Sequence, residues 1–330
     1  MTKGVRIAAS GVMLVLVTSC SGTAGSGRPA PEPFTAFVAD GKGTVTVFNT
    51  VTGTVLETIK AGGENRAIAI TPDAKTAYVA DDGSGTVIPI DTATRTPGTP
   101  VKVGKYPDGI AITPDGTTAY VTNADSGTVT PIDTATNTAG KPIRAGGSPV
   151  AIAITPDGKT AYVADHTDPG TVTPIDIATG TAGKPVRVGA YPVAVAIAPD
   201  GTTAYVASYG PGTVTPIDTA TNTAGKPIQA GGSPVAIAIT PDGTTAYVAC
   251  SRRLSGSGTV TAVRLATRAV AQPVKVGKFP AAVAITPDGS TAYVASSLPN
   301  IVTPIQTATD TAGTPVKAGL FPLAIAFISG

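Results

Sequence analysis

Residues 113–140 read TPDGTTAYVTNADSGTVTPIDTATNTAG, and residues 198–225 repeat them closely as APDGTTAYVASYGPGTVTPIDTATNTAG. Each stretch holds short runs of β-branched and aromatic residues between Pro-Asp-Gly and Asp-Thr-Ala-Thr-Asn-Thr. Runs of about five such residues between turn formers are typical of antiparallel strands. A helical interpretation fails, because no window combines ten residues free of Pro and Gly with a 3.6-residue apolar period.

This unit is repeated along most of the chain. The proline of the Thr/Ala-Pro-Asp motif recurs at spacings of 42, 42, 43, 42 and 46 residues. Its six copies are Pro72, Pro114, Pro156, Pro199, Pro241 and Pro287. In the unit around Pro114 the four predicted strands are 108–112, 118–122, 128–132 and 141–145. Four short strands in about 42 residues are the signature of a β-propeller blade.

The number of strand copies predicts seven blades. Second-strand copies begin at Thr35, Thr76, Thr118, Thr160, Thr203, Thr245 and Thr291. First-strand copies begin at Arg66, Asp108, Val150, Val193, Val235, Ala281 and Leu323. The repeat therefore starts at a second strand, 35–40, and finishes with a first strand, 323–328. We expect these two strands to pair and close the ring, because an open ring would leave unpaired edges.

The first strands also predict how the blades pack. Runs such as VAIAIT alternate large and small residues, so a row of Ala in one blade can accept the Val and Ile row of the next. Six tyrosines, with Phe37 as the seventh copy, recur at one second-strand position and are expected in this core. The tyrosines are Tyr78, Tyr120, Tyr162, Tyr205, Tyr247 and Tyr293.

The sequence AYVTN at 119–123, within ITPDGTTAYVTN, resembles the YVTN-repeat β-propeller family of secreted and surface proteins of bacteria and archaea. The resemblance covers nearly everything after residue 34 and recurs in every blade. It implies an all-β, seven-bladed propeller of four-stranded antiparallel blades over 34–330. It implies little about function, because the matching residues are those that build strands and turns.

The first thirty-three residues predict a targeted and tethered N-terminus. The apolar run 7–17 is shorter than the roughly 20 residues that a membrane span needs. It ends in Val17-Thr18-Ser19-Cys20, which resembles a bacterial lipobox. We therefore expect a lipoprotein signal peptide over 1–19 and lipidation of Cys20, with 20–33 as a flexible tether outside the cytoplasm. The alternative is an ordinary secretory signal that contains a cysteine by chance.

Composition argues against several classes of function. The formal net charge is +2 and the Lys and Arg residues are scattered, which argues against nucleic-acid binding. His166 is the only histidine, so a multi-histidine metal site is excluded, and no G-x-S-x-G motif occurs. We therefore predict no metal, no cofactor and no catalytic residue, in a monomer that meets the membrane only through its lipid.

Positions that differ between blades are the candidates for function, because the fold does not dictate them. Two residues before the first strand, four of seven copies are aromatic, and exposed rings stack on sugars or partner side chains. The alternative is that each ring covers the end of its own blade. The turns after the second strands vary most, the longest being CSRRLSGSG at 250–258. The candidates for ligand or partner binding are Arg66, Tyr106, Asp108, His166, Tyr191, Tyr209, Arg252, Arg253, Phe279 and Phe321.

Two further patterns involve charge. Arg66 and Asp108 are the only charged residues that begin a first strand, and their blades adjoin. We expect a structural ion pair across the blade boundary, with a clamp for a polar ligand as the alternative. The residue that follows the second strand is acidic or an amide in four consecutive blades, which predicts turn capping, with calcium ligation as the alternative. These four residues are Asp40, Asp81, Asn123 and Asp165.

The sequence thus predicts a lipid-anchored extracytoplasmic propeller that acts as a binding or scaffolding module for an envelope protein or a cell-wall glycan. Residues 127–164 and 212–249 differ only at Arg144 versus Gln229 and Lys159 versus Thr244. Such copied blades favour a broad binding face over an asymmetric catalytic centre. The alternative is an enzyme that acts on a small cyclic ester, because similar propellers include lactonases and lyases.

Overall fold

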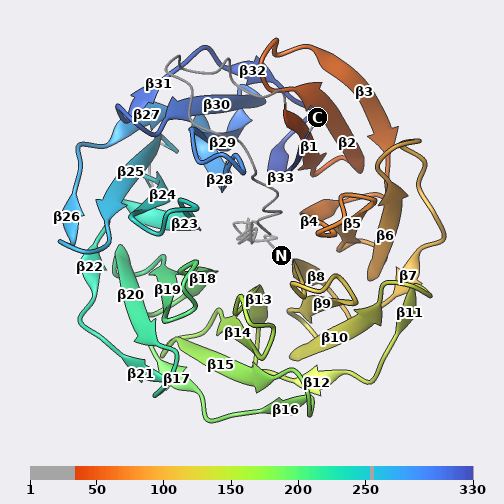
Figure 1. The fold of residues 1–330 in the computed structure, drawn as a ribbon, viewed down its shortest axis with the longest axis horizontal. Coiled ribbons are helices and arrows are strands. Elements are labelled where there is room, and N and C mark those ends of the chain that lie inside the picture. The colour runs from red at the N-terminus through yellow and green to blue at the C-terminus, as the bar shows by residue number, and fades with distance from the viewer. Residues whose placement is uncertain (1–33, 253–255, 330) are drawn as a thin grey trace, which may run out of the picture.

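The computed structural model describes residues 34–252 and 256–329, which form seven antiparallel sheets arranged in one ring (Figure 1). The predicted seven-bladed β-propeller is thereby confirmed. The predicted signal peptide, Cys20, the tether and Arg253 lie outside the described residues. No helix long and apolar enough to cross a membrane occurs in the described part of the chain.

Each blade has an inner strand next to the axis of the ring and a second strand beside it (Figure 1). The inner strands are β33 (Pro322–Ser329), β4 (Asn65–Ile70), β8 (Pro107–Ile112), β13 (Pro149–Ile154), β18 (Pro192–Ile197), β23 (Ser233–Ile239) and β28 (Lys278–Ile285). The second strands are β1 (Phe34–Asp40), β5 (Thr76–Asp81), β9 (Thr118–Asn123), β14 (Thr160–Asp165), β19 (Thr203–Ser208), β24 (Thr245–Ser251) and β29 (Thr291–Leu298).

The remaining strands form the outer half of each blade. The third strands are β2 (Thr44–Asn49), β6 (Thr86–Asp91), β10 (Thr128–Asp133), β15 (Thr171–Asp176), β20 (Thr213–Asp218), β25 (Gly258–Arg264) and β30 (Ile301–Gln306). The outer strands are β3 (Val55–Lys60), β7 (Val101–Lys102), β11 (Thr138–Ala139), β12 (Ile143–Arg144), β16 (Thr181–Ala182), β17 (Val186–Arg187), β21 (Thr223–Ala224), β22 (Ile228–Gln229), β26 (Ala269–Val270), β27 (Val274–Val276), β31 (Thr311–Ala312) and β32 (Val316–Lys317).

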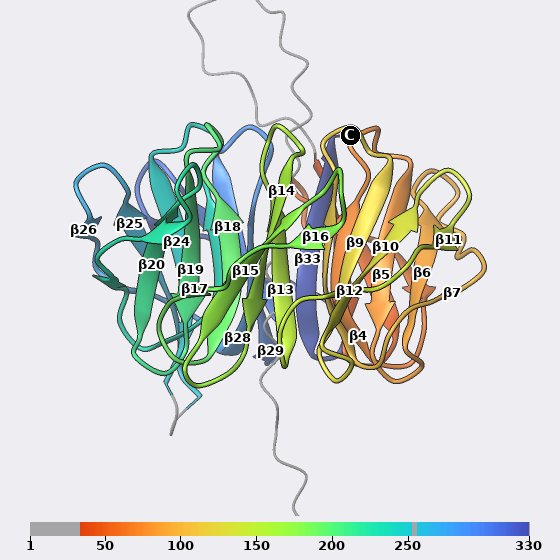
Figure 2. The ribbon, with the colours of Figure 1, turned by 90° about the horizontal axis from the view of Figure 1, so that it is seen from below.

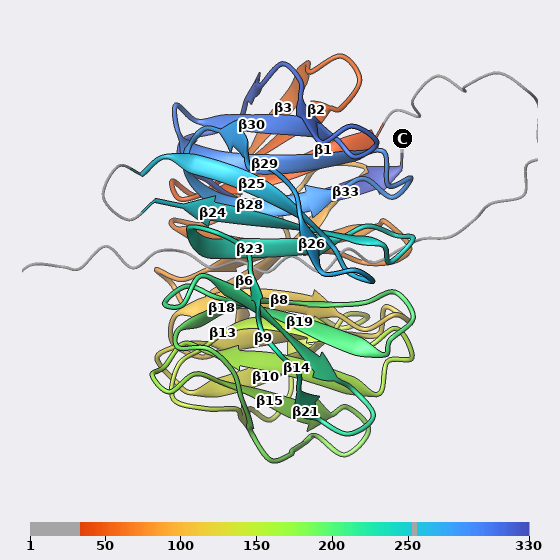
Figure 3. The same ribbon diagram turned by 90° about the vertical axis from the view of Figure 1, so that its left-hand side faces the viewer.

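Blade 1 is the sheet that closes the ring, with the order β3-β2-β1-β33. Blades 2 to 7 follow in chain order, from β4–β7 to β28–β32. Strand β33 pairs with β1 in antiparallel register, with Ala36 opposite Phe327 and Val38 opposite Ile325 (Figures 1 and 3). The predicted pairing of the last strand with the first three is confirmed.

The ring has two faces, which carry different sets of loops (Figure 2). The crossover face carries the loops that lead from one blade to the inner strand of the next, and also the turns between second and third strands. The turn face carries the Pro-Asp-Gly turns and the Asp-Thr-Ala-Thr turns. Strand β1 begins and strand β33 ends at the turn face, because Phe34 pairs with Ser329 and Asp40 with Pro322.

The hydrophobic core lies between adjacent blades, as the alternating first strands predict. Between blades 2 and 3, Ala67 and Ala69 of β4 share a buried cluster with Ile110 and Ile112 of β8. A small side chain on one blade leaves room for a large one on the next, which fills the space at interior density. Each blade is therefore buried on both faces by its neighbours.

The fourth strand is more broken than the sequence predicts. The predicted strand 141–145 is observed as β12 at Ile143–Arg144, preceded by the separate two-residue strand β11. Pro131 of β10 accepts a hydrogen bond from the N–H of Gly140 (2.8 Å), but a proline has no N–H to donate in return. Pro142 lacks an N–H as well, so the ladder is interrupted between the two short strands.

The repeated tyrosines do more than fill the core. The hydroxyl of Tyr162, in blade 4, donates to the backbone oxygen of Thr219 (3.2 Å) and to Oδ1 of Asn222 (2.8 Å) in blade 5. Burial, with the nearby charges of Asp218 and Asp157, raises the pKa of Tyr162 to about 12, so the hydroxyl keeps its proton. The same bond ties Tyr78 to Asn137 and Tyr247 to Asp310.

Removing one of these hydroxyls tests whether they bind the blades together. We expect Tyr162→Phe to lower the free energy of unfolding by about 1 kcal/mol, the usual net value of a buried hydrogen bond. Tyr120→Phe is the control, because within the described residues the Tyr120 hydroxyl has no hydrogen-bond partner, and it should cost less than half as much. Chemical denaturation measures both, and equal losses would show that the hydroxyl does not join the blades.

Candidate functional site

Strand-end side chains hold the loops of the crossover face in place. The carboxylate of Asp81 accepts hydrogen bonds from the backbone N–H groups of Gly63 (3.2 Å) and Glu64 (2.9 Å), in the loop that enters blade 2. Asp165 and Asn123 hold the loops that enter blades 4 and 3 in the same way. The predicted capping residues thus bind the crossover loops as well as their own turns.

These carboxylates do not converge on a shared ion site. Their oxygens already accept backbone and hydroxyl hydrogen bonds, as Asp81 also does from the Ser84 hydroxyl at 2.7 Å. Among residues 34–252 and 256–329, no group of three or more His, Cys, Asp or Glu side chains is placed to hold a metal ion. The geometry of these residues therefore supports capping and gives no support to the calcium alternative.

In the loops that enter blades 2, 3 and 4, a glycine makes room for the capping side chain. Gly146 has φ of +132°, and a Cβ added there would lie 2.6 Å from Cγ of Asp165. No ordinary side chain fits at that distance, so the loop needs glycine for space as well as for conformation. The aligned residue before blade 3 is Gly104, where an added Cβ would lie equally close to Asn123.

The crossover loops fall into two classes, and one class is strained. In loops of the Ala-Gly-Gly type, which enter blades 2, 4 and 6, glycines adopt the positive φ angles. In the other four loops an aromatic residue before proline adopts φ of +50° to +60°. A bulky residue rarely takes this left-handed conformation, which costs roughly 1–2 kcal/mol. The four residues are Tyr106, Tyr191, Phe279 and Phe321.

Three of these aromatic side chains are substantially exposed. Tyr191, Phe279 and Phe321 expose 40%, 47% and 42% of their surface at the crossover face. Fixing an aromatic ring in a strained conformation while leaving it in water is unfavourable for folding alone. Such an arrangement is typical of a binding surface. We call the crossover-face surface formed by Tyr106, Tyr191, Phe279 and Phe321 the aromatic rim.

The other side of each ring packs against protein. Tyr191, which enters blade 5, lies 5.3 Å from the His166 ring of blade 4, measured between ring centroids. Phe279, which enters blade 7, covers Gly256 of blade 6. Phe321 lies under Nζ of Lys42, 5.8 Å from the ring centroid, in blade 1 itself. The expectation that each ring covers its own blade is met by Phe321 and in part by Tyr191, whose ring also lies beside Gly210 of blade 5. Phe279 covers the preceding blade.

Arg66 lies in a polar cluster on the same face, at the boundary of blades 2 and 3. We call Arg66 with Asp82, Tyr106 and Asp108 the Arg66 cluster. The Nε of Arg66 lies 2.6 Å from Oδ2 of Asp82, and the side chains of the two residues are 15% and 2% exposed. Its Nη2 donates to the Tyr106 hydroxyl, and the guanidinium carbon lies 5.0 Å from the centre of the Tyr106 ring. The ion pair shown is therefore with Asp82 of the same blade, and buried Asp108 acts on Arg66 through its charge.

Burial and nearby charges shift the pKa of Arg66 in opposite directions in this cluster. Burial lowers the pKa of Arg66, but the hydrogen bond with Asp82 and the charges of Asp108 and Asp82 outweigh it, so the pKa is raised. The pKa of Asp82 is also raised, mainly by burial, with a further contribution from Glu64 and opposition from Arg66. The guanidinium thus offsets the cost of keeping carboxylates away from water.

The other candidates are dispersed. Arg252 is exposed at the end of β24, where its N–H and C=O bond to the loop 256–257. Tyr209 is half-buried and packs against the core. Cys250 is buried, and desolvation raises the pKa of its thiol to about 12, which disfavours the reactive thiolate. The structure brings predicted residues together in two places, Arg66 with Tyr106 and Asp108, and His166 with Tyr191.

Sequence reasoning missed Asp82 of the Arg66 cluster and its neighbour Glu64. Asp82 forms the ion pair with Arg66, and Glu64 interacts with Asp82. The available signal was the second aspartate of DDGSG at 81–85. The aligned positions in the next three blades are Ala124, His166 and Tyr209. Asp82 is an acidic residue that the aligned positions of these blades lack, and Arg66 is equally unusual among the first strands. These two departures in the same blade indicated that Asp82 and Arg66 form an ion pair.

Many solved structures share the fold of this chain. Hydrazine synthase of Kuenenia stuttgartiensis is 24% identical, with a TM-score of 0.73 over 80% of this chain and 89% of that chain. A protein of unknown function from Desulfotomaculum acetoxidans is 20% identical, with a TM-score of 0.76 over 89% and 98%. A Bacteroides uniformis protein assigned as a 6-phosphogluconolactonase is 18% identical, with a TM-score of 0.72 over 90% and 100%.

At these identities the likeness shows the propeller fold alone. No family model matches the sequence. No curated protein matches it either.

Replacing Arg66 tests whether it compensates the buried carboxylates. We expect Arg66→Met to cost about 3 kcal/mol at neutral pH, because Asp82 is left buried and unpaired. Asp82 has a raised pKa in the folded state, so it takes up a proton before its unfolded counterpart near 3.8 does. The deficit should therefore shrink as the pH falls from 7 toward 4, as measured by denaturation at several pH values.

A matched control uses the exposed ion pair of Arg95 with Glu57 (3.3 Å). Arg95→Met should cost less than about 1 kcal/mol, because exposed pairs contribute little. A loss for Arg66→Met that is no larger than this, or that grows on acidification, would contradict the compensating role.

Proposed function

We propose that this protein is a YVTN-repeat propeller that acts as a lipid-anchored binding module of the cell envelope, and that the aromatic rim binds an envelope protein or a cell-wall glycan. The observation that supports it best is the exposure of Tyr191, Phe279 and Phe321 in strained conformations on one face. Aromatic faces stack on sugar rings and on partner side chains.

The position of the first described strand suggests how the rim is presented. Phe34 begins β1 at the turn face, opposite the rim. If Cys20 carries lipid, the tether 21–33 spans at most about 45 Å and joins the propeller at the turn face. The turn face then lies toward the membrane, and the rim faces away from it, toward the envelope partner.

Crosslinking in intact cells tests this proposal. The tagged full-length protein is compared with a rim variant that carries Tyr191→Gly, Phe279→Gly and Phe321→Gly. Glycine adopts positive φ without steric strain, which offsets part of the ring packing that is lost, and thermal unfolding checks that the variant folds. We expect wild type to recover one envelope protein, or to bind purified peptidoglycan, and the rim variant to lose most of that binding. The control Val51→Ala with Val270→Ala removes exposed apolar groups away from the rim and should bind normally.

The same experiment includes Cys20→Ala, which should leave the membrane fraction and keep its fold. A rim variant that binds like wild type, or wild-type recovery no higher than the untagged background, would contradict the binding proposal. Membrane association that persists in Cys20→Ala would contradict the anchor. Turnover of a lactone panel that is abolished by Arg66→Ala would instead favour the enzyme alternative.

A further inference from the structure

The outer strand of blade 1 has an open edge. Strand β3 spans six residues without a proline, and its ladder with β2 is regular from Glu57 to Lys60, before a register shift between Val47 and Phe48 of β2. The N–H of Ala61 donates to the backbone oxygen of Gly43 (2.8 Å), which fixes the register of the ladder with β2. By the alternation of an antiparallel pair, Thr58 and Lys60 direct their N–H and C=O groups away from β2, toward solvent.

In the other blades the corresponding outer edge is shorter. Their outer strands are two or three residues long in the described part of the chain. Short, proline-interrupted edges are a common defence against unwanted strand pairing. Strand β3 lacks that defence, and its Val55 and Leu56 are 46% and 43% exposed.

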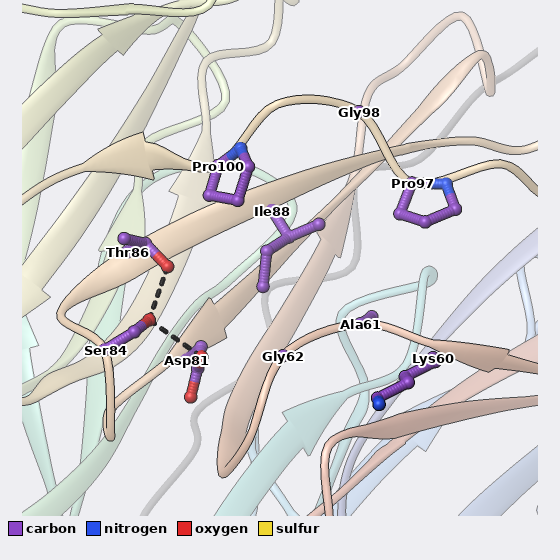
Figure 4. Close-up of a pocket in the computed structure, with 10 residues that line it drawn as sticks. All are labelled: Lys60, Ala61, Gly62, Asp81, Ser84, Thr86, Ile88, Pro97, Gly98 and Pro100. Carbon is purple, nitrogen blue, oxygen red and sulfur yellow. Dashed lines mark hydrogen bonds between the residues drawn. The ribbon is translucent and has the colours of Figure 1, made fainter.

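A pocket of about 330 Å³ lies beside β3, between blades 1 and 2 (Figure 4). At four other blade boundaries the outer strands of neighbouring blades touch, as β12 touches β16 and β17 touches β21. In blade 2 the outer segment contains Pro97 and Pro100 and pairs with β6 only through β7 and one bridge, which leaves this space open. The pocket is lined by Lys60, Ala61, Gly62, Asp81, Ser84, Thr86, Ile88, Pro97, Gly98 and Pro100.

The pocket has an apolar centre that is peculiar to blade 2. Figure 4 shows Ile88 between the two prolines and the Ala61–Gly62 segment. The other six blades carry threonine at this position of the third strand, at Thr46, Thr130, Thr173, Thr215, Thr261 and Thr303. Ile88, the one isoleucine at this position, therefore lies in the blade whose outer segment leaves a pocket beside the open edge of β3.

We propose that β3 binds an extended segment of another polypeptide as a fifth strand of blade 1. The outward N–H and C=O groups of Thr58 and Lys60 match the backbone of a strand. A ligand residue opposite Ile59 shares its face of the sheet, which is turned toward blade 2, and so its apolar side chain enters the Ile88 pocket. Exposed Lys60 favours an acidic residue opposite it.

The size of the pocket agrees with this occupant. Sites for small molecules usually enclose about 300–1,000 Å³, so a pocket of 330 Å³ is at the lower limit and suits one or two side chains. The site lies on the perimeter of the ring and uses none of the aromatic-rim residues. The inference is therefore independent of the proposed function.

A phage library of random nine-residue peptides, panned against the full-length protein, tests the proposal. We expect enrichment of peptides that alternate apolar and polar residues and carry an acidic residue near one apolar position. Thr58→Pro removes the outward N–H while leaving the β2 ladder intact, and should weaken the best enriched peptide at least tenfold. Thr58→Val keeps that N–H and should bind like wild type.

Thermal unfolding of Thr58→Pro and Thr58→Val checks that both variants fold. Should Thr58→Pro fail to fold, Ile88→Thr gives blade 2 the residue of the other six blades and should weaken the same peptide at least threefold. No enriched peptide, or one that binds Thr58→Pro and Ile88→Thr as it binds wild type, would overturn the proposal. The rim variant should bind the peptide normally, which separates failure here from failure of the rim.

Discussion

The pairing of β33 with β1 is the contact that turns seven sheets into one ring. Strand β33 completes the four strands of blade 1, and Ile325 and Phe327 join Phe34 and Val38 in one buried cluster. Each blade has two apolar faces, and each face is covered only because the next blade is present. Opening the ring at this point would expose a sheet edge and loosen the cover of two neighbouring blades. The geometry of the crossover face, which carries the aromatic rim and the Arg66 cluster, depends on that closure.

Repetition explains the shape of the molecule, and the departures from it explain where function is sought. In three crossover loops only glycines take positive φ angles, whereas in each of the other four an aromatic residue does. The aromatic version costs conformational energy that the glycine version avoids. Tyr191 and Phe321 adopt it while exposed on the face opposite the start of β1, which supports the proposed binding role. The open edge of β3 and the isoleucine at Ile88 are departures of the same kind.

Much of the fold follows from the sequence, because turns and strands are local. Pro-Asp-Gly turns, β-branched runs and their spacing predict the seven blades, and the offset of the first and second strands predicts the closure. The break between β11 and β12 was not predicted, because it depends on how Pro131 of β10 and Pro142 of the outer segment together interrupt the pairing between the strands. The site was less predictable than the fold. Arg66 and Asp108 were singled out as unusual charges, whereas the ion-pair partner, Asp82, was missed although it too is a charge that the aligned positions of the next three blades lack.

Native-state hydrogen exchange tests the central claim that closure by β33 holds the ring together. The measurement compares amides of β1 and β33 with those of β13 and β14, which belong to one uninterrupted blade. If closure is part of the cooperative core, both sets should exchange only through global unfolding, with opening free energies equal within about 1 kcal/mol. Exchange of β33 through a local opening several kcal/mol cheaper, while β13 and β14 stay protected, would show that the other blades do not need the closing strand.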